Sequence, residues 1–131
     1  MVRILIVDDK HDIRKMIREF LEAESDLMVC GEGADGQQAV DRAASLQPHV
    51  IVLDVSMPVM NGFDAARQIL QASPRVLILI LSLHDDRQYT LGAKDCGAHG
   101  FLAKRDAAEF LRPAISALLR GELYFPGIAA K

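Results

Sequence analysis

The sequence has little of what marks several classes of protein. It holds two cysteines, Cys30 and Cys96, with no CxxC pair and no Cys/His cluster, which argues against a disulfide framework or a zinc site. No apolar run approaches the length of a membrane span. The opening segment MVRILIVDDKHD turns acidic after a short apolar run, unlike a secretory signal. We therefore expect a soluble, cytoplasmic chain with reduced thiols and no membrane contact.

The chain has no excess of basic residues. It contains fifteen Lys and Arg and eighteen Asp and Glu, giving a formal net charge of −3. Proteins that bind nucleic acid usually carry a basic surface. The composition therefore predicts no direct nucleic-acid binding by this chain. Its 131 residues, half of them hydrophobic, fit a single domain with one well-filled core.

Five short apolar runs alternate with helical patterns along the chain. The predicted strands cover residues 2–7, 27–30, 50–53, 76–81 and 100–103. Each is followed by a stretch with apolar residues at helical spacing, the first one marked by Ile13, Met16, Ile17, Phe20 and Leu21. Strict strand–helix alternation predicts an α/β fold, with a parallel sheet, right-handed crossovers and helices on both faces.

Two of the predicted helices contain residues that disfavour a helix. Gly92 lies within the fourth, at 86–96, and predicts a weak helix. Pro113 interrupts the last pattern, so we expect a kink or a late helix start there. Gly121 marks the expected end of that helix. We accordingly predict a domain over residues 1–121 and the beginning of a linker over 122–131.

Polar side chains follow four of the five predicted strands. Asp8 and Asp9 come after the first, Asp54 after the third, Ser82 after the fourth and Lys104 after the fifth. The carboxyl ends of parallel strands share one edge of the sheet, where sites of such folds form. Three carboxylates in one pocket repel one another unless a cation is present. A hard ion with oxygen ligands meets this need, and we expect Mg²⁺.

The same residues suggest a reaction. A carboxylate such as Asp54 can attack phosphorus and form an acyl phosphate. Negative charge then spreads over the phosphoryl oxygens, which the Lys104 ammonium and the Ser82 hydroxyl could each contact. A general base is unnecessary because the nucleophile is already ionised. Taken singly, however, the aspartates could be helix-cap or turn residues, and Ser82 and Lys104 ordinary strand-end and surface residues.

A glycine motif offers a different function. Gly31, Gly33 and Gly36 form GxGxxG between a strand and a helix, the pattern of a dinucleotide-binding loop. The motif follows the second strand, however, and places Glu32 and Asp35 where a pyrophosphate would lie. Two carboxylates oppose phosphate binding at a helix N-terminus, which disfavours this hypothesis.

The ordered motifs resemble those of bacterial two-component response-regulator receiver domains over essentially the whole chain. They are the Asp8–Asp9 pair, Asp54 in VLDVSMPVMNG, Ser82 in LILSLHD and Lys104 in GFLAK. LSLHDD, GAHGFLAK and AISALLRGELYF further resemble the NarL/FixJ-like subfamily. The resemblance implies a flavodoxin-like receiver fold, with five parallel strands in the order 2-1-3-4-5.

The resemblance also implies a role for each matching residue. Asp54 would accept a phosphoryl group from a sensor histidine kinase with the help of Mg²⁺. The metal ligands would be Asp9, Asp54 and the backbone carbonyl of Ser56, with Asp8 acting indirectly in the acid pocket. Lys104 and the hydroxyl switch Ser82 would contact the phosphoryl group.

Phe101 matches the aromatic switch of the family, although an aromatic residue on an edge strand can serve packing alone. Phosphorylation would change the surface of the fourth helix, fifth strand and fifth helix, and could produce a homodimer. NarL/FixJ-like regulators act on DNA through a helix-turn-helix output domain, which would be missing here. A stand-alone receiver acting through protein contacts is the alternative.

Two further functions fit the sequence less well. Aspartyl-phosphate hydrolases usually carry a second acid two residues after the nucleophile, and here that position is Ser56. We therefore expect that the chain is not an enzyme and assists only its own phosphorylation and dephosphorylation. A degenerate receiver that only binds partners usually lacks an acid or the lysine, and this chain has both.

Overall fold

The computed structural model describes residues 1–23 and 26–126, and its strands and helices alternate as predicted. The elements are β1 (Val2–Val7), α1 (His11–Glu22), β2 (Leu27–Gly33), α2 (Gly36–Leu46), β3 (Val50–Asp54), α3 (Gly62–Ala72), β4 (Leu77–Ser82), α4 (Arg87–Asp95), β5 (Gly100–Ala103), a 3₁₀ turn (Lys104–Asp106) and α5 (Ala107–Leu119). No helix among these residues is long and apolar enough to cross a membrane.

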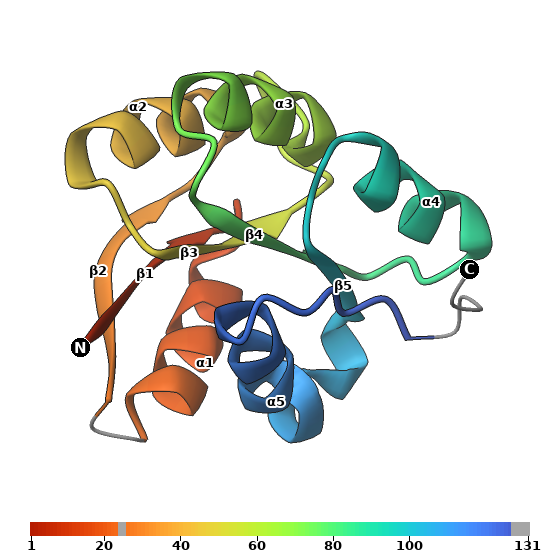
Figure 1. Ribbon diagram of the computed structural model, residues 1–131. Helices are drawn as coiled ribbons and strands as arrows, with labels where there is room; N and C mark the ends of the chain where they lie inside the picture. Colours follow the sequence, from red (N-terminus) through yellow and green to blue (C-terminus); the bar gives the residue numbers. More distant parts are fainter. Residues whose placement is uncertain (24–25, 127–131) are drawn as a thin grey trace.

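The five strands form one parallel sheet in the expected order, β2-β1-β3-β4-β5. Helices α1 and α5 cover one face, and α2, α3 and α4 cover the other (Figure 1). All strands run in the same direction, so their carboxyl ends lie along one edge. The predicted α/β fold is confirmed, and with it the edge at which a site should form.

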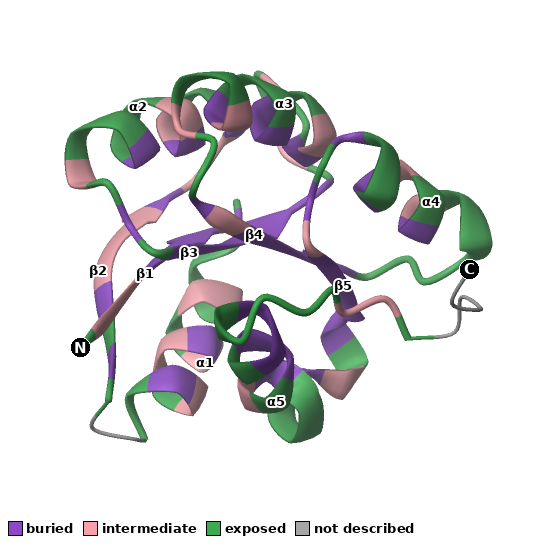
Figure 2. Cartoon of the chain, in the orientation of Figure 1, coloured by how far each residue is buried: buried purple, intermediate pink, exposed green. Residues whose placement is uncertain are grey.

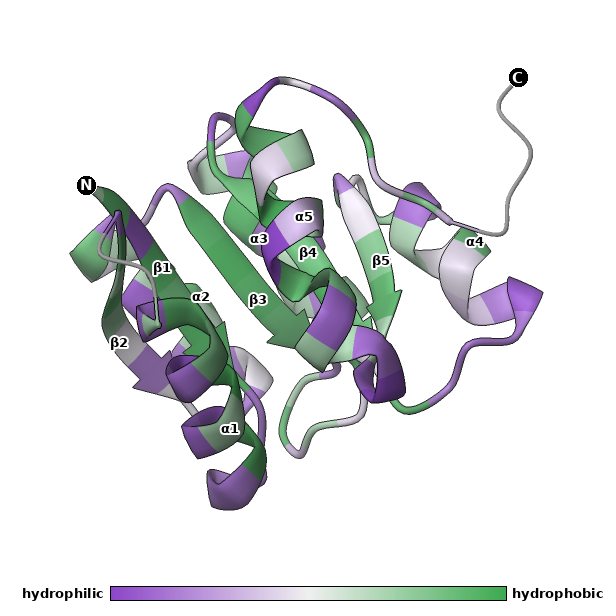
Figure 3. Ribbon diagram, turned by 90° about the horizontal axis from the view of Figure 1, so that it is seen from below, coloured by the Kyte–Doolittle hydropathy of each residue, from purple (hydrophilic) through white to green (hydrophobic). Residues whose placement is uncertain are grey.

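Two apolar clusters, one on each face of the sheet, stabilise this arrangement. In β1, Leu5 and Val7 belong to the cluster under α2–α4, whereas Ile4 and Ile6 belong to the cluster under α1 and α5. Successive strand side chains point to opposite faces, which produces this division. The middle of the sheet is accordingly buried and hydrophobic, between helices with exposed hydrophilic outer faces (Figures 2 and 3).

Strand β2 is longer than predicted. It continues to Gly33, past the expected end at Cys30, and its pairing with β1 shifts register between Ile4 and Leu5. The sequence GEG was expected in a loop because it lacks apolar residues. Pairing with the buried strand β1 supplies the backbone partners that keep it extended.

Close packing requires one glycine of the GxGxxG motif, Gly36, where a Cβ atom would lie 2.0 Å from the Met60 carbonyl oxygen. A Cβ atom on Gly31 would meet only the end of the Leu46 side chain, and one on Gly33 would make ordinary contacts at 3.5 Å. Asp35 caps α2, its side chain accepting a hydrogen bond of 2.8 Å from the Gln38 N–H. The acidic cap thus occupies the helix N-terminus that a dinucleotide phosphate would need.

Helices α4 and α5 show how their disfavoured residues are accommodated. Helix α4 is the shortest α-helix described, and the Phe63 ring fills the space beside Gly92, where a Cβ atom would lie 2.8 Å from Phe63 Cε2. Helix α5 begins at Ala107 and continues through Pro113, so a late start is wrong, and a kink at the proline stays a prediction. Pro113 and Glu109 are both exposed, and water can therefore reach the carbonyl that the proline leaves without its usual donor.

Gly121 ends α5 as predicted. It adopts a φ of +83°, and the next residue, Glu122, donates a backbone hydrogen bond of 3.0 Å to the Ala117 carbonyl. This is the geometry of a Schellman helix end, which favours glycine.

The described part of the predicted linker lies against the domain. Phe101 N–H donates to the Tyr124 carbonyl at 2.8 Å, and Tyr124 N–H donates to the His99 carbonyl at 2.9 Å, beside β5 (Figure 1). Phe125 packs on the α2–α4 cluster, with the Lys94 ammonium 5.3 Å from its ring centroid. Residues 127–131 lie outside the described part of the chain, and a linker beginning at 122 stays a prediction.

Candidate functional site

The carboxyl edge of the sheet gathers most of the buried polar side chains in the described part of the chain. Asp8, Asp54, Ser82 and Lys104 are at most 7% exposed, and in the described chain only Thr90 is another polar side chain so buried. Burying polar groups costs free energy unless they are paired. Their concentration at one edge marks it as the candidate site.

The predicted charged residues meet at this edge. Lys104 Nζ lies 2.7 Å from Asp8 Oδ2 and 3.3 Å from Asp54 Oδ1. Asp8, Asp9 and Asp54 each offer a carboxylate oxygen, and these three oxygens lie within 4.8 Å of one another. Asp9 is the exposed member of the three. Segments about fifty residues apart in sequence thus form one acidic cluster, with the Lys104 ammonium at its buried base and the Lys10 ammonium 3.7 Å from Asp9 Oδ1 at its exposed side.

Backbone contacts fix Asp54. Val55 N–H donates a hydrogen bond of 2.9 Å to Asp54 Oδ1, and Gly62 N–H donates one of 2.8 Å to the Val55 carbonyl. A Cβ atom on Gly62 would lie 2.0 Å from the Asp54 carbonyl oxygen, so only glycine lets the start of α3 approach so closely. The intervening loop includes Val59 at a φ of +72°, a strained conformation for a β-branched residue.

Asp8 and Asp9 do not cap α1. The N-cap residue is Lys10, without a side-chain cap, and Lys10 N–H donates a hydrogen bond of 2.9 Å to Asp8 Oδ1. The helix-cap interpretation of the aspartate pair is therefore wrong. The chain bends at Asp9, between β1 and α1, and the Asp8 carboxylate contacts Lys104.

The pocket disfavours ionisation of Asp54. Burial, and next the charge of Asp8, raise the pKa of Asp54 to about 6, although Lys104 and the Val55 N–H oppose this shift. Asp8 Oδ2 is buried and accepts no hydrogen bond from the described residues, so its contact with Lys104 is an ion pair only. Two ammonium groups, the buried Lys104 and the exposed Lys10, do not balance three carboxylates.

These observations fit a hard divalent cation. The donor set consists of carboxylate oxygens, the ligands that Mg²⁺ accepts, and the three carboxylates outnumber the ammonium groups beside them. Asp9 and Asp54 would hold the ion, with Asp8 behind them. Ser56 is exposed two residues after Asp54, and a role for its carbonyl as a ligand stays a prediction.

Ser82 and Phe101 lie on the neighbouring strands. Asp54 pairs with Leu81 in the sheet, so Ser82 stands one residue beyond, and its hydroxyl accepts a hydrogen bond of 3.0 Å from His84 N–H. Phe101 is 3% exposed and belongs to the core cluster under α2–α4. Its packing role is thus observed, and its switch role stays a prediction.

Several polar contacts around the site were not anticipated from the sequence. The His84 ring stacks on Tyr89 of α4 with centroids 4.8 Å apart. Arg105, directly after Lys104, pairs with Asp85 across the two loops. Arg14 contacts the backbone of Asp8. Each pair joins residues from separate elements, and no local pattern predicts such contacts.

Comparison with known proteins identifies the family. The family model described as "Response regulator receiver domain" matches residues 4–116. The chain is 35% identical over 123 residues to the transcriptional regulatory protein DegU of Brevibacillus brevis, covering 94% of this chain and 52% of that protein. It is 40% identical over 120 residues to a protein-glutamate methylesterase/protein-glutamine glutaminase of Vibrio parahaemolyticus, covering 89% and 32% respectively. The chain thus spans about half or less of the length of these relatives.

Solved structures agree with this assignment. A LuxR-family two-component response regulator from Aurantimonas sp. SI85-9A1 superposes with a TM-score of 0.91 at 31% identity, covering 95% of this chain and 89% of that one. The receiver domain of a putative NarL response regulator from Mycobacterium tuberculosis gives 0.87 at 28% identity, covering 92% and 98%. These relatives are consistent with the NarL/FixJ-like subfamily. The chain belongs to the response regulator receiver domain family.

Proposed function

We propose that the chain is a phosphorylation-gated switch in which Asp54 accepts a phosphoryl group from a sensor histidine kinase with the help of Mg²⁺. The observation that supports this proposal most is the cluster itself. Three carboxylate oxygens lie within 4.8 Å of one another, and Lys104 Nζ is 3.3 Å from Asp54 Oδ1. A structural ion pair would need one carboxylate for one ammonium, whereas this site has an excess of acid.

The reaction is a displacement at phosphorus. A carboxylate oxygen of Asp54 forms a new bond to phosphorus while the bond between phosphorus and the donor's histidine nitrogen breaks, leaving an acyl phosphate. Asp9, Asp54 and the Ser56 carbonyl would hold Mg²⁺, which would supply positive charge beside the carboxylates and the phosphoryl group. The Lys104 ammonium is close enough to Asp54 to contact another phosphoryl oxygen.

The response would begin at Ser82. Its hydroxyl oxygen accepts a hydrogen bond from His84 N–H while its O–H can donate to the phosphoryl group, so a shift of Ser82 toward that group would displace the His84 loop. His84 stacks on Tyr89, so movement of this loop would reach α4. Phe101 and the short helix α4 would then adopt a second arrangement, which changes the α4–β5–α5 surface. Phosphorylation shifts this equilibrium only by its different interaction with the two arrangements.

The proposal extends to an output domain and a partner copy. Because DegU, described as a transcriptional regulatory protein, is about twice as long as the matched region, we infer an output domain beyond this chain that binds DNA. The chain would then act in the cytoplasm and form a homodimer when phosphorylated. The alternative is a stand-alone receiver that acts through protein contacts. Neither version gives the chain an enzymatic activity beyond its own phosphorylation and dephosphorylation.

Labelling with a small phosphodonor tests the central step. In the presence of Mg²⁺, the native chain should form a phosphoprotein that hydroxylamine cleaves, detected on a phosphate-affinity gel. Asp54→Asn should abolish the shifted band, whereas Asp12→Asn, which alters a fully exposed carboxylate, should leave it unchanged. Undiminished labelling of the Asp54→Asn variant would place the acceptor elsewhere and refute the proposal.

A further inference from the structure

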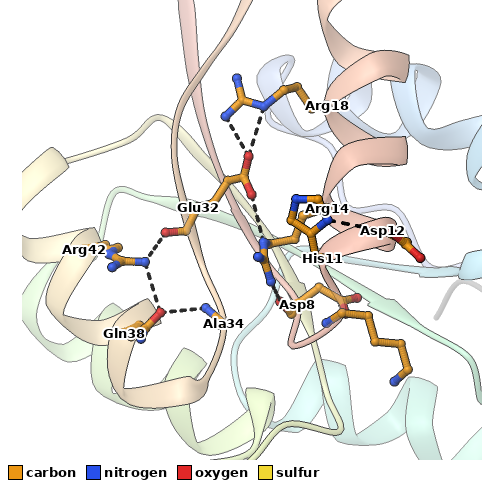
Figure 4. A network of polar contacts seen from close by, with 10 residues as sticks. Asp8, His11, Asp12, Arg14, Arg18, Glu32, Ala34, Gln38 and Arg42 are labelled. Carbon is orange, nitrogen blue, oxygen red and sulfur yellow. Dashed lines mark hydrogen bonds and ion pairs between the residues drawn. The ribbon is translucent and has the colours of Figure 1, made fainter.

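The carbonyl group that links Asp8 to Asp9 has an unusual partner. Arg14 of α1 donates from Nη1 to the Asp8 carbonyl oxygen at 2.7 Å, and from Nε to Glu32 Oε1 at 2.8 Å (Figure 4). Its side chain is only 16% exposed. One guanidinium therefore bridges the end of β2 to the peptide bond that precedes the exposed carboxylate of the acidic cluster.

Glu32 holds Arg14 in this orientation. Burial alone would raise the pKa of Glu32, but hydrogen bonds from Arg18 and Arg14 outweigh burial and hold the pKa below its ordinary value. Glu32 is therefore an anion at neutral pH. Arg18 binds its second oxygen, with Nη2 2.7 Å and Nε 3.0 Å from Oε2, but Arg18 makes no described contact with Asp8 (Figure 4).

We infer that Arg14, oriented by Glu32, is a positioning residue that presets the Asp8–Asp9 backbone for the metal. This inference rests on the proposed function. Asp9 is the exposed carboxylate of the cluster and lies at a bend of the chain, so its direction depends on the peptide bond before it. A planar guanidinium with two fixed donors restrains that peptide bond better than a flexible side chain. Ligands that already have the bound geometry bind a metal more tightly, because less conformational entropy is lost when the metal binds.

Simple electrostatics predicts the opposite effect. A guanidinium beside the site repels a divalent cation, so its removal alone should strengthen Mg²⁺ binding. If Arg14 acts chiefly by positioning the backbone, its removal should weaken Mg²⁺ binding instead. The sign of the change in affinity therefore separates the two roles. A second measurement, urea unfolding without metal, detects a general loss of stability.

The chain offers a control. Arg14→Gln removes contacts with both Glu32 and the Asp8 carbonyl. Arg18→Gln removes the ion pairs of Arg18 with Glu32 and Glu22 and leaves the Asp8 carbonyl bonded. Arg14→Lys keeps the charge, but one ammonium replaces the two donors of the planar guanidinium, so we expect an intermediate affinity. Mg²⁺ dissociation constants of the four proteins would come from NMR titrations of the Asp9 and Asp54 amide resonances.

We expect Arg14→Gln to raise the dissociation constant for Mg²⁺ about tenfold, the lower end for outer-shell partners of a metal. Arg18→Gln should stay within about twofold of the native value. An unchanged or tighter Arg14→Gln variant, or an equal loss in both variants, would overturn the positioning role while leaving the proposed function intact. Absence of Mg²⁺ binding by the native chain would instead overturn the proposed function and this inference together.

Discussion

Replacing Asp54 with asparagine should make the metal-free protein more stable at neutral pH. Burial and the neighbouring Asp8 raise the pKa of Asp54 to about 6 in the folded protein, against 3.8 in an ordinary aspartate. The folded state therefore binds a proton more tightly than the unfolded chain, and ionisation favours unfolding. The difference corresponds to about 3 kcal/mol of unfolding free energy at pH 7.5, where the carboxyl is ionised in both states. Asparagine resembles the protonated side chain and avoids this cost.

The pH dependence gives the prediction its sign. The advantage of Asp54→Asn should shrink as pH falls through the folded pKa, to about 0.5 kcal/mol at pH 4, because the native carboxyl then takes up its proton. Urea unfolding followed by circular dichroism, in chelator and at both pH values, measures it. Asp12→Asn is the exposed control. An Asp54→Asn variant that is no more stable than the native chain at pH 7.5 would refute the electrostatic account of the pocket.

Two other changes test how the surroundings of the site are built. Val59→Gly should raise the unfolding free energy by about 0.5–1 kcal/mol, because strain at a φ of +72° exceeds the entropy cost of glycine at this exposed position. A fall in the unfolding free energy of the variant would show that the loop is not strained. A chain ending at Glu122 should unfold about 2 kcal/mol more easily than one ending at Pro126, since it loses the β5 hydrogen bonds of Tyr124 and the packing of Phe125. Equal urea midpoints would contradict that packing role.

The strands and the site were predictable because both depend on local pattern. An apolar run that stops at an acid, such as Leu53 followed by Asp54, specifies a buried strand and the polar group at its end. Alternation of strands and helices then places all strand ends at one edge. The contact of Lys104 with Asp8 and Asp54 follows from that rule without any detail of the side chains.

Features that depend on distant partners were not predictable. The extension of β2 to Gly33 requires its pairing with β1, and Tyr124 is held by the backbone of β5. The bond from Arg14 to Glu32 joins residues eighteen apart on different elements. Helix α5 tolerates Pro113 because that turn faces solvent, which the sequence pattern alone does not reveal.

The account depends on separate strands presenting their acidic ends to a common cation. The most direct test is a titration of the ¹⁵N-labelled native chain with Mg²⁺, monitored by two-dimensional NMR. Saturable shifts centred on the amides of Asp9, Asp54 and Ser56, and lost in the Asp9→Asn variant, are the predicted result. A uniform drift without saturation at millimolar Mg²⁺, or shifts confined to other exposed acidic residues, would contradict it.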